Sequence, residues 1–283
     1  MFKLKYISNK RDRLTNEFMT IEFGKYPYFA SYGDMQNYEW DYTDNSDYGR
    51  VSDFRRGIRE YVLPVVIARS GSASAINRLH EVIDYDVMNG VKGRLYYGDA
   101  YKEGWFYAGT PSAYKGTDHM IKIELKFITD ASAWIKETSY TINAHDIIVG
   151  TETEGVNTFS DFPIDFNYDL VGGSSRIDVE INAYAYMKLI INGSATAPAV
   201  TIGDNVYSVD YAITDGERIE IDTRKKTVMY YDVNNRARNI FSFRDREHDI
   251  FAKLQNGSNI IETNGVFDIQ LTVIEERSMA EWI

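Results

Sequence analysis

Hydrophobic and polar residues alternate along several short segments of the chain, which is typical of β-strands with one buried face. Near the start, Phe2, Leu4 and Tyr6 alternate with lysines. In residues 120–129 the positions expected to face inward are Ile121, Ile123, Leu125 and Phe127. Both segments are predicted to be strands.

Between these two strands lie segments with less regular patterns. Residues 17–48 are rich in Tyr, Asp and Asn without a clear period, and are predicted to form short strands or long loops. Residues 59–68 form a mostly apolar run interrupted by Pro64. Because proline cannot donate to a strand ladder, this run is predicted to be a buried strand with a bulge or at a sheet edge.

The period changes to that of a helix after residue 72. Apolar residues recur there at helical spacing: Ile76, Leu79, Val82, Ile83 and Val87. Asn89 and Gly90 supply the left-handed conformation at which helices often end. A helix ending near residue 89 is therefore predicted, with His80 at its flank.

The second half of the chain has an all-β pattern. Residues 138–163 mix Thr, Gly, Asn and acidic residues, so a domain boundary is placed near their start, giving domains 1–137 and 138–283. Beyond them, short alternating segments are separated by turn pairs such as Asn192-Gly193 and Asp215-Gly216. Such spacing predicts a β-sandwich or barrel. The fold class is therefore mainly β, with one helix in the first domain.

Composition narrows the function classes. A net charge of −11 disfavours nucleic acid as the main ligand, because phosphate binding needs a basic surface. The chain has no cysteine, which excludes disulfides, thiolate nucleophiles and sulfur-ligated metals. No secretory signal is recognised, and the longest apolar run, residues 61–68, is too short to span a bilayer. We expect a soluble protein with no membrane insertion.

The acidic segment GERIEIDTRKKTVMYYD, residues 216–232, is a candidate for carboxylate chemistry. In an extended strand Glu220 and Asp222 lie on one face about 7 Å apart, a separation compatible with a glycoside hydrolase. However, Ile219 and Ile221 occupy the opposite face. If the isoleucines point inward, both carboxylates point outward. No apolar surroundings are then present to raise the pKa of one carboxylate above that of the other, which acid–base catalysis by the pair would require. The segment is therefore interpreted as a structural hairpin.

Other candidate chemistry is sparse. The four histidines, His80, His119, His145 and His248, have no second histidine two to four residues away, so no metal site is predicted. No nucleophile elbow is present, and VGGSS at 171–175 is interpreted as a turn. No catalytic, cofactor-binding or metal-binding residues are predicted, and we expect a protein that is not an enzyme.

The segment NIFSFRDREHDIF, residues 239–251, has two interpretations. Phe241 and Phe243 are expected to alternate inward at the end of a strand. The charged run from Arg244 to Glu247 is then a surface turn with local salt bridges, or a charged seam against a neighbouring subunit.

The C-terminal third resembles the distal tail protein family of long-tailed, non-contractile phages and related prophages. The resemblance is carried, in the family's order, by Gly216–Val228, Phe243–Glu247, Gly257-Ser258-Asn259, and Glu275-Glu276-Arg277 with Trp282. In the first half, LKFITDASAW resembles a strand exit of the same family. Ala131 and Ala280 stand where the family commonly has proline, which bears on the local turns.

The resemblance implies a fold and a role. The N-terminal domain is expected to be a β-sandwich with one helix and a β-hairpin that packs into a homohexameric ring. The C-terminal domain is expected to be a galectin-like β-sandwich, without the sugar-binding residues of galectins. The ring would lie at the distal end of the tail tube in the virion, leaving a channel for DNA, after assembly in the host cytoplasm. Implied partners are the tail tube protein, a tail-associated fibre or lysin protein, and receptor-binding or baseplate proteins.

Ring closure requires two different patches on each subunit that recognise each other. The Pro64 strand and the aromatic-rich segment 26–48 are the candidates. An acidic chain would also suit a channel that DNA passes without sticking. Two alternatives remain open: a carbohydrate-binding adhesin using Trp40 and Trp105, and a glycoside hydrolase using the acidic hairpin.

Overall fold

A computed structural model describes residues 4–31, 33–45, 49–68, 72–111, 120–143, 174–181 and 184–280. The chain divides into two compact units, of which the first comprises Met1–Lys136 and Glu276–Ile283 and the second Glu137–Glu275. Residues 276–283, which the sequence pattern assigned to the second domain, thus group with the first unit. There the amide of Ala280 donates a 3.2 Å hydrogen bond to Oε1 of Gln36.

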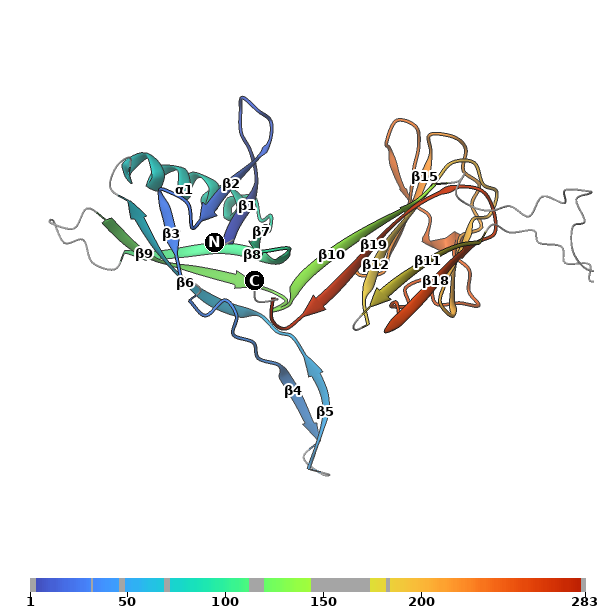
Figure 1. The fold of residues 1–283 in the computed structure, drawn as a ribbon, viewed down its shortest axis with the longest axis horizontal. Coiled ribbons are helices and arrows are strands. Elements are labelled where there is room, and N and C mark those ends of the chain that lie inside the picture. Colours follow the sequence, from blue (N-terminus) through green and yellow to red (C-terminus); the bar gives the residue numbers. More distant parts are fainter. Residues whose placement is uncertain are drawn as a thin grey trace, which may run out of the picture. The chain divides into compact units, whose positions relative to one another are not determined.

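The first unit is built from antiparallel strands and one helix (Figure 1). Its elements are β1 (Leu4–Arg11), β2 (Phe18–Phe23), β3 (Tyr28–Ala30), β4 (Asp41–Asn45), β5 (Arg50–Arg55), β6 (Arg59–Ala68), α1 (Ser72–Met88), β7 (Gly93–Tyr97), β8 (Ala100–Pro111), β9 (Met120–Thr129) and the start of β10 (Trp134–Ile142). One sheet has the order β10-β8-β7-β1-β2, the other β3-β6-β9-β8, and β4 pairs only with β5. Helix α1 packs mainly on β1 and β8.

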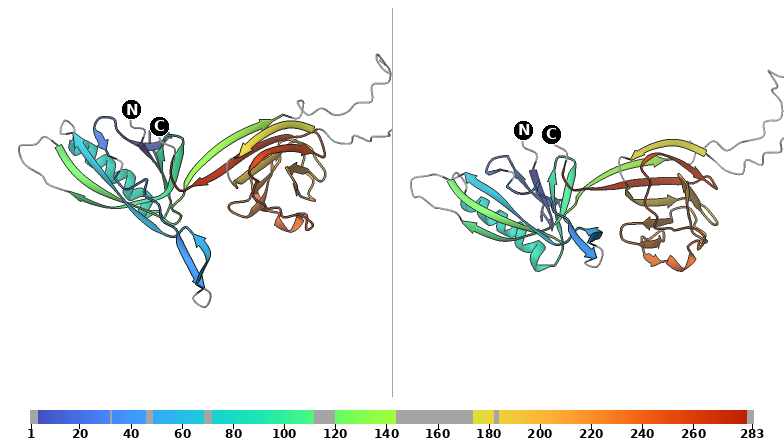
Figure 2. Two further views of the ribbon diagram at one scale, coloured as in Figure 1. Left: turned by 60° about the horizontal axis from the view of Figure 1, so that its bottom comes forward. Right: turned by 90° about the horizontal axis from the view of Figure 1, so that it is seen from below.

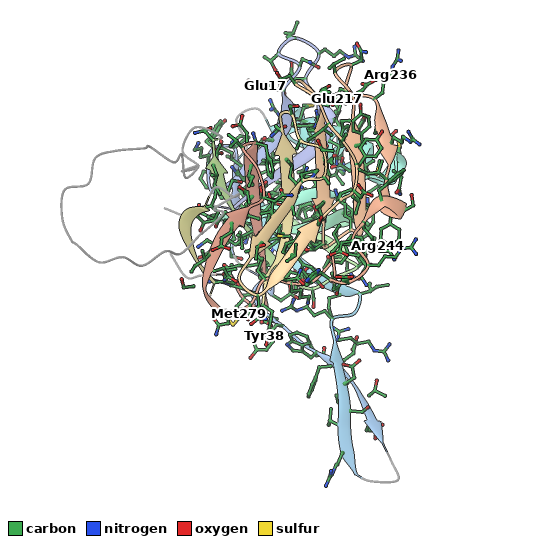
Figure 3. The ribbon with its side chains drawn as sticks, turned by 90° about the vertical axis from the view of Figure 1, so that its right-hand side faces the viewer. Glu17, Tyr38, Glu217, Arg236, Arg244 and Met279 are labelled. Carbon is green, nitrogen blue, oxygen red and sulfur yellow. The ribbon has the colours of Figure 1, made fainter. Side chains whose placement is uncertain are left out.

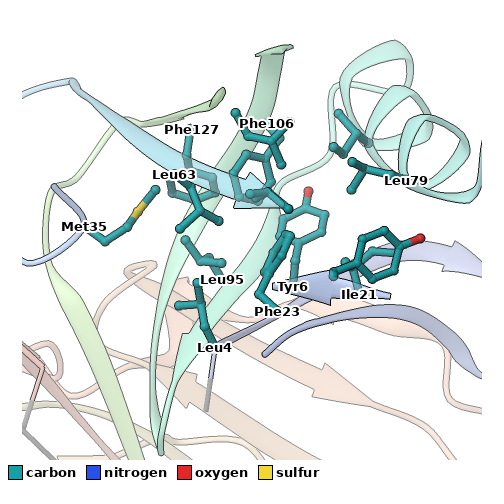
Figure 4. Close-up of a cluster of buried hydrophobic side chains, with 14 of the residues drawn as sticks. Leu4, Tyr6, Ile21, Phe23, Met35, Leu63, Leu79, Leu95, Phe106 and Phe127 are labelled. Carbon is teal, nitrogen blue, oxygen red and sulfur yellow. The ribbon is translucent and has the colours of Figure 1, made fainter. Parts of the chain in front are cut away.

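The core of the first unit follows the predicted alternation. Leu4 and Tyr6 are buried, whereas Phe2 lies outside the described residues. On β9 the inward positions Ile123, Leu125 and Phe127 are buried, and Ile121 packs partly against them. The side chains from β1, β2, β6, β8 and β9 meet in one cluster (Figure 4). The strand prediction for both segments is confirmed.

Helix α1 is confirmed, with one exception in its apolar face. Leu79 and Val82 are fully buried, and Ile83 is nearly so. Val87 was expected to join them but is 44% exposed. The inward position of the last turn is held instead by Asp86, whose carboxylate is fully buried. The helix ends as predicted, with Gly90 at a φ of 62°.

The expectation for Pro64 is wrong. Strand β6 pairs with β9 in continuous register from Arg59 to Ala68, so there is no bulge, and its other side pairs with β3. Strand β3 ends at Ala30, so Pro64 lies just beyond the last pair on that side. The amide of Ser31, the residue after β3, donates to the Pro64 carbonyl at 3.2 Å, so the chain still pairs at this position and only the bond that a proline N–H would donate is missing.

The second unit contains two antiparallel sheets, seen from two further sides in Figure 2. Its strands are β11 (Ser174–Ile181), β12 (Tyr186–Asn192), β13 (Ala199–Ile202), β14 (Asn205–Ser208), β15 (Arg218–Asp222), β16 (Thr227–Tyr231), β17 (Ala237–Asn239), β18 (Gly257–Thr263) and β19 (Asp268–Arg277), with the distal part of β10. The sheet orders are β17-β16-β15-β12-β19-β10 and β11-β18-β13-β14. Their inward side chains form a single core. The chain is therefore mainly β, as expected.

Strands β10 and β19 carry the chain between the two units. In the parts of the chain that are described, no helix combines the length and apolar character needed to cross a bilayer.

Candidate functional site

The hairpin formed by β4 and β5 stands clear of both sheets of the first unit (Figures 1 and 3). Every residue of β5 is exposed. Large apolar side chains are exposed on the hairpin and on the segments at its base: Tyr38 (57%), Trp40 (38%), Tyr42 (64%), Val51 (51%), Phe54 (60%) and Ile58 (67%). We call these six residues the hairpin surface.

The hairpin is held mainly by its own ladder. Tyr42 lies directly opposite Phe54, and the register shifts between Thr43 and Asp44. Ser52 Oγ donates to the Thr43 carbonyl at 2.9 Å, which reinforces the pair near this shift. A two-stranded hairpin with no buried face is only marginally stable in water. The hairpin surface is therefore a candidate interaction surface.

The base of the hairpin is fixed by two arginines. Arg59 donates to the Asp41 carboxylate at 2.6 Å, and this hydrogen bond raises the pKa of Arg59. Arg56 bonds Glu276 at 3.3 Å, and its guanidinium lies 4.4 Å from the centroid of the Trp40 ring. These contacts set the direction in which the hairpin leaves the unit.

Gly57 permits the close packing at this base, because a Cβ there would lie 2.1 Å from Asp41 Oδ2. The sequence pattern included β4 in an aromatic-rich segment but missed both arginines. Their signal was the basic run RRGIR, residues 55–59, at the entry to a buried strand.

The acidic segment is a hairpin, as predicted, but its carboxylates are not both solvated. Ile219 and Ile221 are fully buried, as expected. Glu220 pairs with Lys188 at 2.9 Å, and its side chain is only 13% exposed, although it was expected to point outward. Asp222 was expected to point outward, yet it is only 3% exposed.

Asp222 is buried because its carboxylate turns back onto the chain. Its Oδ1 accepts hydrogen bonds from the backbone amides of Arg224 (3.0 Å) and Lys225 (2.9 Å). An aspartate that accepts from amides two and three residues ahead stabilises a turn. Both carboxylates of the proposed catalytic pair thus have structural partners.

A third carboxylate, Glu217, stabilises the start of the same hairpin by hydrogen bonds. It accepts hydrogen bonds from the Tyr230 hydroxyl and, at 2.8 Å, from the amide of Thr214. The hydrogen bond from Tyr230 lowers the pKa of Glu217, and the same bond raises the pKa of Tyr230 to about 12. The pair therefore stays in its hydrogen-bonded form at neutral pH.

The expectation for Phe241 and Phe243 is wrong. They lie in a 3-10 helix, Phe241–Phe243, and are 37% and 40% exposed. The buried residues of the segment 239–251 are Ile240, at 0% exposure, and Ile250, at 2%. Since a 3-10 turn does not alternate, the period-two rule fails here. Phe241 stacks on Phe251 with ring centroids 5.5 Å apart.

The charged run that follows forms a local turn. Asp245 accepts from the amide of Glu247 at 2.9 Å, and its other oxygen lies 2.6 Å from Nδ1 of His248. The amide and the histidine lower the pKa of Asp245. These contacts favour the surface-turn interpretation over a seam that awaits a partner.

The remaining candidates are dispersed. His80 is exposed on α1, and His119 and His145 lie outside the described residues. Among the residues described, no three acidic or histidine side chains are grouped to hold a metal ion. Each of the two tryptophans considered for glycan binding faces a cation: Trp40 is stacked by Arg56, and Lys92 Nζ lies 5.6 Å from the Trp105 ring centroid.

The fold was compared with known proteins. No protein-family model matches the sequence, and no curated protein matches it significantly. Three solved structures are similar along almost the whole chain. One is the crystal structure of SPP1 Dit, described as a paradigm of the hub adsorption apparatus in phages that infect Gram-positive bacteria, with 11% identity, a TM-score of 0.49, and coverage of 98% of this chain and 99% of that one.

The other two are chains of the phage P2 baseplate in its activated conformation. The structure with Ca gives 10% identity and a TM-score of 0.58, and the structure with Sr gives 11% and 0.59. Each alignment covers 99% of this chain and 100% of the other. The chain therefore has the fold of these phage baseplate chains over both of its units.

Proposed function

We propose that this protein is a structural component of a phage tail tip. Six copies form a ring at the distal end of the tail tube and link the tube to the proteins that recognise the host. The observation that carries the proposal is the likeness to the P2 baseplate chains, which runs through both units without a missing domain. Fold alone does not fix function, so the exposed surfaces supply the second support.

The hairpin surface supports self-association. Tyr42 and Phe54 form an exposed cross-strand pair on an arm that the chain's own core does not cover. In a head-to-tail ring each subunit needs one projecting patch and one receiving patch. The hairpin is the projecting patch of the first unit. The second unit is then the part that meets further baseplate or receptor-binding proteins.

The channel of the ring would pass DNA. The net charge of −11 is compatible with a lining that does not bind phosphate. The tail tube protein and a tail-associated fibre or lysin protein would contact the two faces of the ring. A strongly basic lining in a structure of the assembled ring would contradict this part of the proposal.

Light scattering on the purified chain tests the oligomer directly. A hexamer has six times 32.5 kDa, about 195 kDa, and should appear as a ring in negative stain. If the ring needs its neighbours, addition of the tail tube protein should produce it. A chain that stays monomeric with the tube protein present and binds cell-wall polysaccharide would instead be an adhesin.

A further inference from the structure

Four exposed residues share one face of the β4–β5 hairpin. Tyr42 lies directly opposite Phe54, and Asp44 lies directly opposite Val51. Because Tyr42 and Asp44 are two residues apart on β4, their side chains point to the same side of the hairpin. Their cross-strand partners point to that side as well. We call Tyr42, Asp44, Val51 and Phe54 the docking face.

The docking face depends on the shift of register in the hairpin. Ser52 has no partner between two aligned pairs, so it is the extra residue of a bulge. Val51 and Phe54 are three residues apart and would lie on opposite faces of a regular strand. The bulge therefore gathers three apolar side chains and one carboxylate on one exposed face.

A pocket of about 430 Å³ lies beside α1 in the same unit. The turn between β2 and β3 supplies Tyr26, Pro27 and Tyr28 to its wall, and α1 supplies Ala75 and Arg78. Small-molecule pockets in proteins measure about 300–1,000 Å³, so this volume is enough for an aromatic side chain. We call it the α1 pocket.

Hydrogen bonds within the unit hold the walls of the α1 pocket in place. The Tyr28 hydroxyl donates to the Ala75 carbonyl at 2.7 Å, which joins β3 to α1. The amide of Ala68 donates to the Pro27 carbonyl at 2.9 Å, which ties the turn to the end of β6. The pocket is thus formed before any partner binds, which reduces the entropy cost of binding.

Arg78 gives the α1 pocket a positive charge. Of the acidic side chains on the adjoining elements, Glu22 is paired with Lys25, and Glu81 is paired with Lys10. Among the residues that the structure describes, no carboxylate forms an ion pair with Arg78. A carboxylate that a partner brings to the rim of the pocket would therefore meet a cation.

The hairpin and the α1 pocket lie on different sides of the first unit. In Figure 1, β4 and β5 extend below the unit, whereas α1 lies on its upper side. The bond between Arg59 and Asp41 fixes the base of the hairpin, so the hairpin does not fold back onto its own pocket. Two different patches on different sides of one subunit are what a head-to-tail contact between copies requires.

We propose that the docking face of one copy binds in the α1 pocket of the next copy. One aromatic side chain of the Tyr42–Phe54 pair enters the pocket, and Asp44 lies beside Arg78 at its rim. Tyr42 and Asp44 are about 7 Å apart along β4, so both contacts can form together. The inference rests on the hexameric ring of the proposed function and adds the patch that receives the hairpin.

Cross-linking tests the contact, because the chain has no cysteine of its own. Val51→Cys on the docking face, combined with Ser74→Cys in the α1 pocket, should give covalent dimers and larger species up to the hexamer with a short bismaleimide. The matched control combines Val51→Cys with Asp84→Cys. Asp84 is exposed on the same helix, about 15 Å from Ser74, and should give about tenfold less product.

Light scattering on the same samples separates this inference from the proposed function. If the hexamer forms but the test pair links no better than the control, the receiving patch lies elsewhere and the ring stands. If the chain stays monomeric even with the tail tube protein present, both proposals fall. Covalent oligomers from the test pair alone support both.

Exchange of the two charges tests the ion pair. Arg78→Asp places two acids side by side and should raise the concentration for half assembly about tenfold or more, as should Asp44→Arg. The two changes together should restore assembly. Asp53→Arg, on the opposite face of the hairpin, should assemble like the parent chain. A double variant that melts normally but assembles no better than the single variants would overturn the pairing.

Discussion

The Tyr6 hydroxyl donates a 2.7 Å hydrogen bond to the Asp86 carboxylate, and both side chains are fully buried. The bond joins β1 to the last turn of α1, across 80 residues of sequence. The second carboxylate oxygen accepts the backbone amide of Asn9 at 2.9 Å and its side-chain amide at 3.2 Å. Burial, the hydrogen bond and the charge of Asp86 raise the pKa of Tyr6, so the phenol remains a donor.

Asp86→Ala should therefore destabilise the first unit. Three donors would lose their acceptor, one of them buried and two part-buried, and we expect a loss of about 3 kcal/mol in the free energy of unfolding. Urea denaturation followed by circular dichroism measures this. The control is Asp84→Ala on the exposed face of the same helix. Similar midpoints for the two variants would show that the buried carboxylate does not anchor α1.

Removal of the apolar pair on the hairpin should block self-association. Tyr42→Asp combined with Phe54→Asp places charges on an exposed arm. The melting temperature of the fold should not change. The hexamer of about 195 kDa (six times 32.5 kDa) should be replaced by a monomer of 32.5 kDa. Light scattering and thermal melts measure the two effects. Val266→Asp, at a 49% exposed apolar residue of the second unit, is the control. A double variant that still forms rings would place the interface elsewhere.

The arginine at the hairpin base should control the order of the arm. Arg59→Met removes the bond to Asp41, whose side chain is 45% exposed while that of Arg59 is 22% exposed, so global stability should fall by only about 1 kcal/mol. Hydrogen exchange of β4 and β5 should nevertheless become faster. Arg50→Met, at the other end of the exposed strand β5, is the matched control. Unchanged exchange in Arg59→Met would mean that the hairpin is held by its ladder alone.

The buried lysine should make stability rise with pH. The pKa of Lys102 is about 7 in the folded chain against an ordinary value of 10.5. Between these values the unfolded chain binds one more proton than the folded chain, so unfolding becomes harder as the pH rises. The slope for one proton is about 1.4 kcal/mol per pH unit. The free energy of unfolding should therefore increase as the pH rises above about 7, and this gain should be lost again as the pH falls back to 7.

Urea unfolding of the parent chain and Lys102→Met at pH 7 and pH 9 measures this slope. The variant should be the more stable of the two at pH 7 and should lack the lysine's contribution to the slope. A parent chain and variant with parallel pH profiles would show that Lys102 is charged in the folded state.

The acidic hairpin offers a test that separates structure from catalysis. Asp222→Ala removes the acceptor of two turn amides and should cost about 1–2 kcal/mol of stability. Glu220→Gln retains an amide oxygen that can accept from Lys188, so it should cost less even though the Glu220 side chain is only 13% exposed. Chemical denaturation distinguishes the two. Loss of a measurable glycan hydrolysis in Glu220→Gln would instead support the hydrolase alternative.

Regular alternation predicted much of this fold. The strand around Leu125, the helix face of Leu79 and Val82, and the inward isoleucines of β15 all follow from periodicity, because apolar burial has a fixed spacing in each element. The prediction failed where a local hydrogen bond or turn overrides the period. Asp222 is buried by its bonds to turn amides, and Phe243 is exposed by a 3-10 turn.

The burial of the charged residues inside the first unit was not predicted from the sequence. Lys102 and Asp86 both lie at inward positions of their elements. The signal was therefore a charged residue at a position where the period of the strand or helix predicts a buried apolar side chain. It was not recognised because charged residues are mostly exposed. The hairpin surface was predicted only as an aromatic-rich segment. Its exposure depends on the absence of covering strands, which no local pattern encodes.

Because residues 276–280 belong to the first unit, some contacts of that unit can form only late in translation. The partner of Arg56, Glu276, and the partner of Gln36, Ala280, are translated only after the whole second unit. A nascent chain that has emerged as far as Lys136 therefore has the Arg59–Asp41 contact at the hairpin base but lacks the contacts of Glu276 and Ala280. The last contacts made at the base of the hairpin are thus those that depend on synthesis of the whole second unit.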